Sequence, residues 1–261
     1  MSRLQDAPGD KISPDHENIT PLFMRRMAAY DFFRNYVQGR KVLEVGFGDG
    51  YGTFYLSQVA ADTTGIDASS SLIDYARSKY VRDNLFFLKG DAARIPFPAG
   101  SFEAVVSAGM LENVRDCKAV LREMDRVLVG YGTALVVTQN RRSELDPVNP
   151  HHYREFGARE LERTLKKVFS EVQVYGLFGS GRYTSMMSGH SCLARKFFAA
   201  DFMGIRRLLP RPVIRAMAGG RKEGHGPLGS MPEEAVLTLD DFRIDASGAD
   251  KALDLIAVCK K

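Results

Sequence analysis

A short apolar run followed by evenly spaced glycines constrains the fold of this chain more than any other feature. The run 41–45 holds three branched apolar residues, as a strand covered on both faces of a parallel sheet requires. Glycines follow at positions 46, 48 and 50, where they remove the side chains from backbone that a ligand approaches. The pattern predicts a buried strand that ends in a ligand-binding loop.

The spacing of the glycines limits the ligand. A dinucleotide fingerprint needs glycines at relative positions one, three and six, but the sixth place holds Tyr51 or Thr53 in the two possible registers. A phosphate-binding P-loop is excluded because no Gly-Lys-Ser/Thr follows. These failures argue against a nicotinamide oxidoreductase. What remains is an acidic-x-Gly-x-Gly-x-Gly motif that begins at Glu44.

After residue 40, short apolar runs alternate with helical patterns, which is typical of a wound parallel sheet. The predicted strands are 41–45, 63–67, 85–89, 102–108, 132–138, 171–177 and 254–259. The predicted helices are 21–37, 51–60, 70–79, 114–128 and 157–168. We therefore expect an α/β fold with a seven-stranded, mostly parallel sheet whose last pair is antiparallel.

The chain divides into four predicted parts. They are an N-terminal arm and helix (1–40), a ligand-binding core (41–177), a basic helical cap insertion (178–235) and C-terminal strands that complete the core sheet (236–261). Between residues 182 and 225 nine lysines and arginines face only two acidic residues, although such a run is also typical of a solvated surface. The apolar face of the cap suits packing on the core, a substrate lid or contact with a membrane surface.

Composition excludes several classes of protein. The opening residues lack the apolar centre of a signal peptide, and no run of about 18 apolar residues suggests a membrane span. Three scattered cysteines are too few for a disulfide framework, and no Cys/His cluster has metal-ligand spacing. We expect a cytoplasmic protein with free thiols and no metal.

Acidic residues stand where predicted strands end. Ligands of a wound sheet bind outside the carboxyl ends of its strands. Asp67 ends the second strand and can accept both hydroxyls of a ribose. Asp91 follows the third strand and can accept from an adenine amino group, while the backbone N–H of Ala92 addresses the ring. Each acid is also a reasonable helix cap or loop residue, but three acids at the correct strand ends, Glu44 included, favour a ligand site over chance.

The motif 44–50 resembles motif I of the class I S-adenosylmethionine-dependent methyltransferases. Segment 95–114 looks like the post-motif II region and fourth strand of their small-molecule, methyltransferase type 11-like group, and 121–133 is similar to the helix and turn before strand five. The resemblance covers residues 40–140. It implies a Rossmann-like class I methyltransferase fold, S-adenosylmethionine as cofactor and transferase activity. The predicted cofactor-binding residues are Glu44, Gly46, Gly48, Gly50, Asp67, Asp91, Ala92, Ser107 and Met110.

Segment 149–156 is similar to an Asn-Pro-x-His-x-x-Glu-Phe signature in a subset of these enzymes, many of them associated with modifying sugars or glycolipids. The implied acceptor is a hydroxyl of a small or medium molecule, a sugar or glycolipid. His152 suits a general base, because imidazoles exchange protons near neutral pH, or it braces helix 157–168. Glu112 is a second candidate catalytic residue. The predicted substrate-binding residues are His151, Tyr153, Arg182, Arg206 and Arg207.

Two rival functions follow from the same residues. The first is a non-catalytic cofactor-binding or regulatory subunit with this fold. The second is a nucleic-acid methyltransferase, which the basic segment favours. Against it, the place after the fourth strand reads 107–110 as Ser-Ala-Gly-Met, without the Asp/Asn-Pro-Pro-Tyr/Phe motif of base methylation, and no RNA-binding module is appended. We expect no nucleic-acid partner, and the sequence predicts no oligomeric state.

Overall fold

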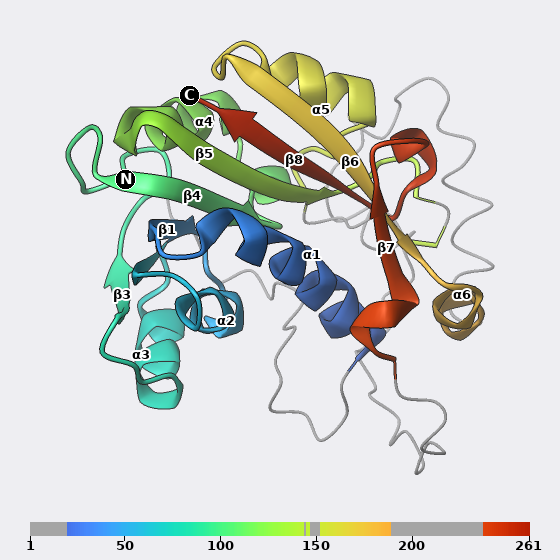
Figure 1. Cartoon of the computed structure of the whole chain (residues 1–261), viewed down its shortest axis with the longest axis horizontal. Coiled ribbons are helices and arrows are strands. Elements are labelled where there is room, and N and C mark those ends of the chain that lie inside the picture. The colour runs from blue at the N-terminus through green and yellow to red at the C-terminus, as the bar shows by residue number, and fades with distance from the viewer. Residues whose placement is uncertain (1–19, 144, 147–151, 189–236) are drawn as a thin grey trace, which may run out of the picture.

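One mixed sheet forms the centre of the molecule (Figure 1). A computed structural model of the chain describes residues 20–143, 145–146, 152–188 and 237–261. Within them, eight strands run in the order β3-β2-β1-β4-β5-β8-β6-β7. The strands are β1 (Lys41–Val45), β2 (Asp62–Asp67), β3 (Leu85–Lys89), β4 (Phe102–Ala108), β5 (Leu128–Gln139), β6 (Glu171–Gly179), β7 (Phe242–Asp245) and β8 (Asp254–Lys260). The first five strands are parallel, and β8, β6 and β7 pair antiparallel.

Helices connect and cover these strands. They are α1 (Pro21–Val37), α2 (Tyr51–Ser57), α3 (Ser70–Lys79), α4 (Cys117–Val127), α5 (Ala158–Leu165) and α6 (Gly181–Ser188), with short 3₁₀ turns η1 (Leu111–Asn113), η4 (Leu239–Asp241) and η5 (Ala249–Lys251). Local capping fixes where two of them begin. Thr20 accepts a hydrogen bond from the Phe23 N–H and is followed by proline, and Asp116 caps the first turn of α4.

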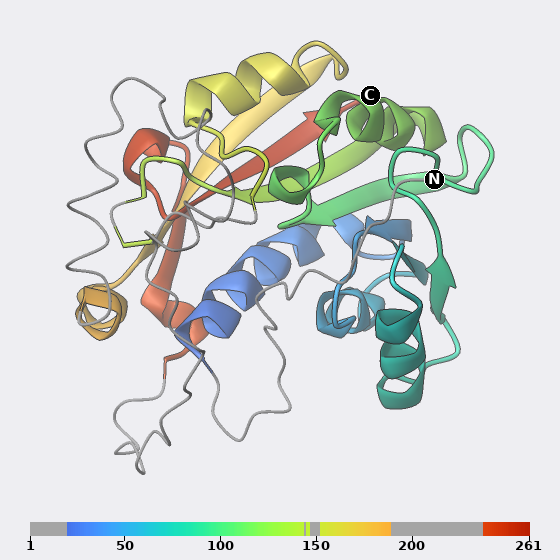
Figure 2. The same ribbon diagram turned by 180° about the vertical axis from the view of Figure 1, so that it is seen from behind.

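Alternate residues of each central strand enter two different cores. Val42 of β1 and Val106 of β4 pack in a cluster that includes α1 and α2. Leu43 and Val105 pack on the opposite face, in a cluster that includes α4 and α5. Seen from behind, Figure 2 shows α4 and α5 on the face that Figure 1 turns away. The arrangement is a three-layer α/β sandwich, and it confirms the predicted fold class.

Most predicted elements match, and two differences have physical reasons. The eighth strand, β7, was missed because its four residues carry no continuous apolar run and pair only with β6 at the edge of the sheet. Strand β5 begins at Leu128, four residues before the predicted 132, because a shift in the register of its pairing with β4 lets the strand continue through this segment. Within the irregular part Tyr131 has a φ of 65°.

The first residues of the predicted cap belong to the core. Residues 178–179 are the end of β6, and Tyr183 of α6 is fully buried against the ring of Phe242. The rest of the predicted cap, 189–235, lies outside the described residues, as does the N-terminal arm before residue 20.

The described part of the chain was searched for a membrane-spanning helix and for a metal site. No helix there is long and apolar enough to cross a membrane. The same residues contain no group of three potential metal-ligating side chains. Cys117 and Cys259 are buried free thiols.

Candidate cofactor and active site

The strand order creates one place where ligands of such sheets bind. The chain passes from β1 to β2 and β3 on one side, and β4 and β5 lie on the other side of β1. Because β1 and β4 are parallel neighbours, their carboxyl ends form the switch point of the sheet. The predicted cofactor residues after β1, β2, β3 and β4 all fall along this edge.

The glycine loop after β1 needs its glycines for conformation and for space. Gly46, Gly48 and Gly50 have φ values of 73°, 59° and 84°, in the left-handed region that favours glycine. A Cβ on Gly46 would lie 2.5 Å from Cγ of Met110, whereas a Cβ on Gly48 would meet nothing within 4 Å. The loop is therefore closed against Met110 at its first glycine and open at its second, where backbone is accessible to a ligand.

Asp67 joins the end of β2 to this loop. Its Oδ2 accepts a hydrogen bond from the Gly48 N–H at 3.2 Å, and its Oδ1 accepts one from the Ser69 N–H at 2.9 Å. Desolvation by burial raises the pKa of Asp67, against the opposing effect of these backbone N–H donors. Each carboxylate oxygen retains a further lone pair, so Asp67 suits paired hydroxyls such as those of a ribose.

Asp91 lies farther along the same edge, two residues after β3. Its side chain is exposed, and its Oδ1 accepts a hydrogen bond from the Ala93 N–H at 2.9 Å. Asp91, Asp67 and the glycine loop thus follow three neighbouring strands, β3, β2 and β1. This row of acceptors beside an open backbone loop fits a long ligand with an adenosine at one end.

Glu44 is placed differently from what its motif suggests. It is fully buried in β1, and its two carboxylate oxygens accept hydrogen bonds from the Tyr30 hydroxyl and the Thr53 hydroxyl, both at 2.6 Å. Desolvation is the largest effect on this group and raises its pKa to about 7. Because α1 and α2 already supply its partners, we expect Glu44 to act on the cofactor through the loop that it supports.

The raised pKa predicts how stability depends on pH. Because the folded-state pKa of Glu44 lies above its ordinary 4.5, the folded protein keeps a proton that the unfolded chain releases. The free energy of unfolding should therefore fall as pH rises from 4.5 to about 7, by at most about 3 kcal/mol from this group. Glu44→Gln should remove that part of the decrease.

Denaturant unfolding at pH 5 and pH 8 tests this expectation. The decrease in the free energy of unfolding between the two pH values should be smaller in Glu44→Gln than in the wild type. Glu171→Gln, at an exposed position on β6, should leave the decrease unchanged. Equal decreases in all three proteins would contradict the assignment of this effect to Glu44.

The loop after β4 faces the glycine loop. Ser107, predicted to face the reactive end of the cofactor, is fully buried, and its Oγ has no hydrogen-bond partner in the described structure. Met110 is half-buried and packs over Gly46. Asn113 donates from Nδ2 to the Gly109 carbonyl at 2.8 Å and so braces the turn.

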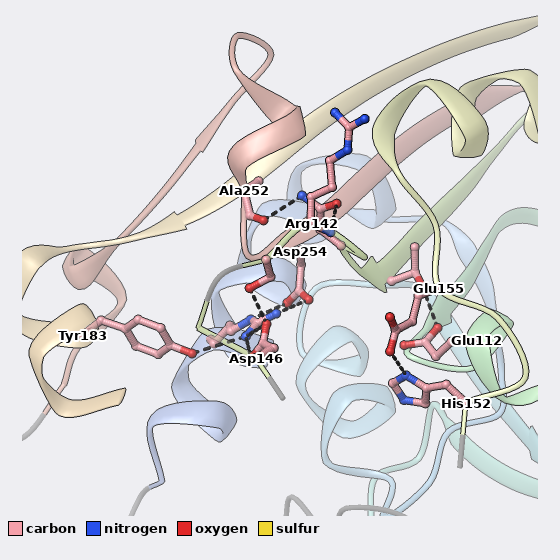
Figure 3. Close-up of polar contacts among 12 residues, drawn as sticks. Glu112, Arg142, Asp146, His152, Glu155, Tyr183, Ala252 and Asp254 are labelled. Carbon is pink, nitrogen blue, oxygen red and sulfur yellow. Dashed lines mark hydrogen bonds and ion pairs between the residues drawn. The ribbon is translucent and has the colours of Figure 1, made fainter. Parts of the chain in front are cut away.

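A second polar group adjoins this loop and contains both predicted catalytic residues (Figure 3). Glu112 of η1 is buried, and its carboxylate accepts from the Thr138 hydroxyl at 2.8 Å. Its backbone carbonyl accepts from the Tyr153 N–H at 2.8 Å, which holds the neighbouring His152 beside η1. Nδ1 of His152 lies 3.4 Å from Oε1 of Glu155, and both side chains are less than a tenth exposed. Glu155 was not among the predicted catalytic residues, although the 149–156 signature contains it.

Two of the predicted substrate-binding residues, Tyr153 and Arg182, belong to the described part of the chain. Tyr153 is exposed beside His152, and the guanidinium of Arg115 lies 5.4 Å from the centre of its ring. Arg182 is on α6, 3.8 Å from Asp241. Figure 3 shows Tyr183 of the same helix on the other side of the Arg25–Asp254 contacts from His152. The described residues do not include His151, Arg206 or Arg207.

Two consecutive arginines of α1 lie near this site, and neither was predicted from the sequence as a site residue. Arg25 is buried and forms what we call the Arg25 cluster with Asp146, Asp254 and Tyr183 (Figure 3). Arg26 lies over the turn after β4, because a Cβ on Gly109 would fall 2.7 Å from its Nη2. The only signal in the sequence was a pair of arginines inside a mostly apolar helix.

Burial and charge act in opposite directions on Arg26. Its Nη1 is buried and has no hydrogen-bond partner in the part of the chain that is described. Desolvation disfavours its charge, but nearby Asp254, Tyr51 and Glu112 outweigh this effect and raise its pKa. Arg26 is thus a charged, incompletely bonded guanidinium at the switch point.

Comparison with known proteins agrees with this geometry. The profile of a family described as a methyltransferase domain matches residues 43–136. A probable S-adenosylmethionine-dependent methyltransferase of Mycobacterium tuberculosis is 29% identical over 259 residues, which cover 96% of this chain and 87% of that protein. Another from Mycolicibacterium smegmatis is 27% identical over 258 residues, covering 96% and 93%.

The fold has relatives among solved structures. An S-adenosylmethionine-dependent methyltransferase of Thermotoga maritima superposes with a TM-score of 0.60 at 15% identity and covers 92% of this chain and 91% of its own. The family profile coincides with the strands that carry the glycine loop, Asp67 and Asp91. The chain therefore belongs to the S-adenosylmethionine-dependent methyltransferases, in the small-molecule group of class I, and S-adenosylmethionine is its methyl donor.

Proposed function

We propose that the acceptor is a hydroxyl group of a small or medium molecule, a sugar or glycolipid, and that His152 is the general base. The observation that carries this proposal is the His152–Glu155 pair, which is held against η1 just after β4. The cofactor supplies a methyl group already activated by its sulfonium. The protein must then align the acceptor, which is a large effect in such displacements, and remove the hydroxyl proton.

The residues along the switch point have separate roles in this proposal. Asp67 binds the ribose hydroxyls, and Asp91 with the Ala92 N–H binds the adenine. Gly46, Gly48 and Gly50 keep the loop in the conformation that exposes its backbone. Met110 packs on Gly46, so it limits where the reactive end of the cofactor lies.

His152 is better suited than Glu112 to take the proton. Its Nδ1 lies 3.4 Å from Oε1 of Glu155 without a hydrogen bond between these two atoms. The acceptor hydroxyl would then meet Nε2, and the nearby carboxylate would stabilise the imidazolium that forms. Glu112 is already bonded to Thr138. The exposed ring of Tyr153 offers an apolar surface for a sugar or an alkyl chain beside this base.

Two further relatives bear on the acceptor. A fatty-acid O-methyltransferase of Mycolicibacterium smegmatis is 37% identical over 111 residues, 42% of this chain and 40% of that protein. A demethylmenaquinone methyltransferase of Staphylococcus aureus is 29% identical over 187 residues. The first name supports an oxygen acceptor. Together with the 149–156 signature, the two favour a molecule that joins polar groups to an apolar portion.

The test is to measure S-adenosylhomocysteine release with candidate acceptors and to identify the linkage. Purified protein would be incubated with S-adenosylmethionine and with sugar-containing lipids, free sugars or fatty acids. A methyl ether, stable to alkaline hydrolysis, is expected by mass spectrometry. A base-labile methyl ester would contradict the proposal, because it would identify a carboxylate acceptor that needs no base.

His152→Gln should lower kcat roughly a hundredfold, towards the low end of what general bases contribute, because alignment still supplies much of the catalysis. The Kd for S-adenosylhomocysteine should stay within about twofold of the wild-type value. Glu155→Gln should cause a smaller loss of kcat, because it only weakens the support of the imidazolium. If Glu112→Gln lost more activity than His152→Gln, the base would be assigned wrongly.

A further inference from the structure

The two adjacent arginines of α1 differ in one decisive way. Arg25 is fully satisfied by the carboxylates of Asp254 and Asp146. Nη1 of Arg26 is also buried, although the residue as a whole is partly exposed, and it has no hydrogen-bond partner among the residues that are described. Leaving a buried guanidinium nitrogen incompletely bonded is unfavourable. Such a residue indicates a site where a ligand completes the bonding.

The position of Arg26 defines which site this is. A Cβ added to Gly109 would lie within 3.0 Å of Nη1, Nη2 and Cζ of Arg26. The guanidinium therefore packs directly on the turn after β4. Tyr30, one helical turn farther along α1, packs on Gly52 and bonds to Glu44 below the glycine loop. This face of α1 therefore spans the carboxyl ends of β1 and β4, which form the switch point.

The carboxylates near Arg26 form their hydrogen bonds with other residues. Glu112 and Asp254 are close enough to favour its positive charge. However, Glu112 bonds to the Thr138 hydroxyl, and Asp254 bonds to Arg25. Neither carboxylate makes a hydrogen bond to Arg26 in the described structure. The guanidinium is held in place and charged, with donor capacity left for an anion.

We propose that Arg26 binds the α-carboxylate of the methionyl part of S-adenosylmethionine. With its ribose and adenine at the ends of β2 and β3, the cofactor must direct its other end towards β4. That end carries the only carboxylate of the molecule, and a guanidinium can bind a carboxylate through two parallel hydrogen bonds. The N-terminus of helix α2 is the other place along this edge where a carboxylate could bind, but that helix has only seven residues.

Two ligands that differ in the methionyl part test the proposal. S-adenosylhomocysteine carries the carboxylate, whereas 5′-methylthioadenosine retains the adenosine and sulfur without the amino-acid portion. In calorimetric titrations of the full chain, Arg26→Met should bind S-adenosylhomocysteine roughly ten- to a hundredfold more weakly. Its Kd for 5′-methylthioadenosine should stay within about twofold. Arg26→Lys, which keeps the charge but not the paired donors, should fall between.

The same titrations contain their own controls. Binding of 5′-methylthioadenosine reports that the adenosine half of the site is folded. Arg34→Met, also on α1 but bonded to Tyr55, should bind both ligands as the wild type does. Unchanged affinity of Arg26→Met for S-adenosylhomocysteine would overturn the proposal and direct Arg26 to an anionic acceptor. An equal loss for both ligands would overturn it too, because Arg26 would then shape the site as a whole.

Discussion

Asp67→Ala is expected to weaken S-adenosylhomocysteine binding roughly a thousandfold. Two hydrogen bonds between a carboxylate and the ribose hydroxyls contribute about 1.5–3 kcal/mol each, which sets the scale of the loss. The substitution also removes the acceptor of the Gly48 and Ser69 N–H groups. The loop that exposes its backbone to the cofactor would then lose its link to β2, so the two effects act in the same direction.

Calorimetric titration with S-adenosylhomocysteine measures this loss directly. Asp62→Ala is the matched control, because Asp62 is an exposed carboxylate at the opposite end of the same strand. It should bind as the wild type does. Asp67→Asn should lie between, since an amide oxygen still accepts one backbone hydrogen bond but carries no charge. Affinity of Asp67→Ala within about threefold of the wild type would show that the ribose is bound elsewhere.

The sequence predicts the parts of this fold that depend on local pattern. Strand β1 and helices α1 and α3 lie where the apolar runs and helical spacing placed them. The ends of β2 and β3 also lie where the apolar runs stop, so the residue pattern alone assigns Asp67 and Asp91 to one edge of the sheet. Local pattern therefore sufficed to place these two acidic residues, and their binding of the cofactor stays a prediction.

Contacts between distant segments were not predictable in this way. Glu44 belongs to the recognised motif, but its partners Tyr30 and Thr53 come from the helices on either side of β1 in the sequence. Their hydroxyls direct the carboxylate into the core. Glu155 is only three residues from His152, but the sequence does not show that this segment is held against η1 by the Glu112 carbonyl. The short edge strand β7 lacks an apolar signal altogether.

Helix α1 shows how one short segment serves both stability and binding. Arg25 reaches Asp254, which is 229 residues away in the sequence and begins β8. Arg26 turns instead to Gly109 after β4. Neighbouring positions of a helix point in different directions, so identical side chains meet different surroundings. Substitution of the two arginines should therefore have opposite consequences for stability and for ligand binding.

Arg25→Met is expected to lower the free energy of unfolding by about 3–5 kcal/mol, because it leaves the carboxylates of Asp254 and Asp146 buried without their cation. This is a large fraction of the stability of an ordinary domain. The Arg25 cluster joins α1, β8 and α6, so its loss weakens several packing contacts at once. Denaturant unfolding at pH 7 measures the effect.

Arg26→Met is the matched control for this experiment, since it removes the same side chain at the next position. Its free energy of unfolding should fall much less than that of Arg25→Met, because Nη1 of Arg26 has no hydrogen-bond partner to lose in the described structure and its substitution leaves Asp254 bonded to Arg25. Adding Asp254→Leu to Arg25→Met should recover part of the lost stability, since it removes one of the two buried carboxylates that have lost their cation. If both single arginine variants lost the same stability, the charge of α1 rather than the Arg25 cluster would be responsible. The difference between the two variants thus distinguishes Arg25, which stabilises the fold, from Arg26, which we propose binds the ligand.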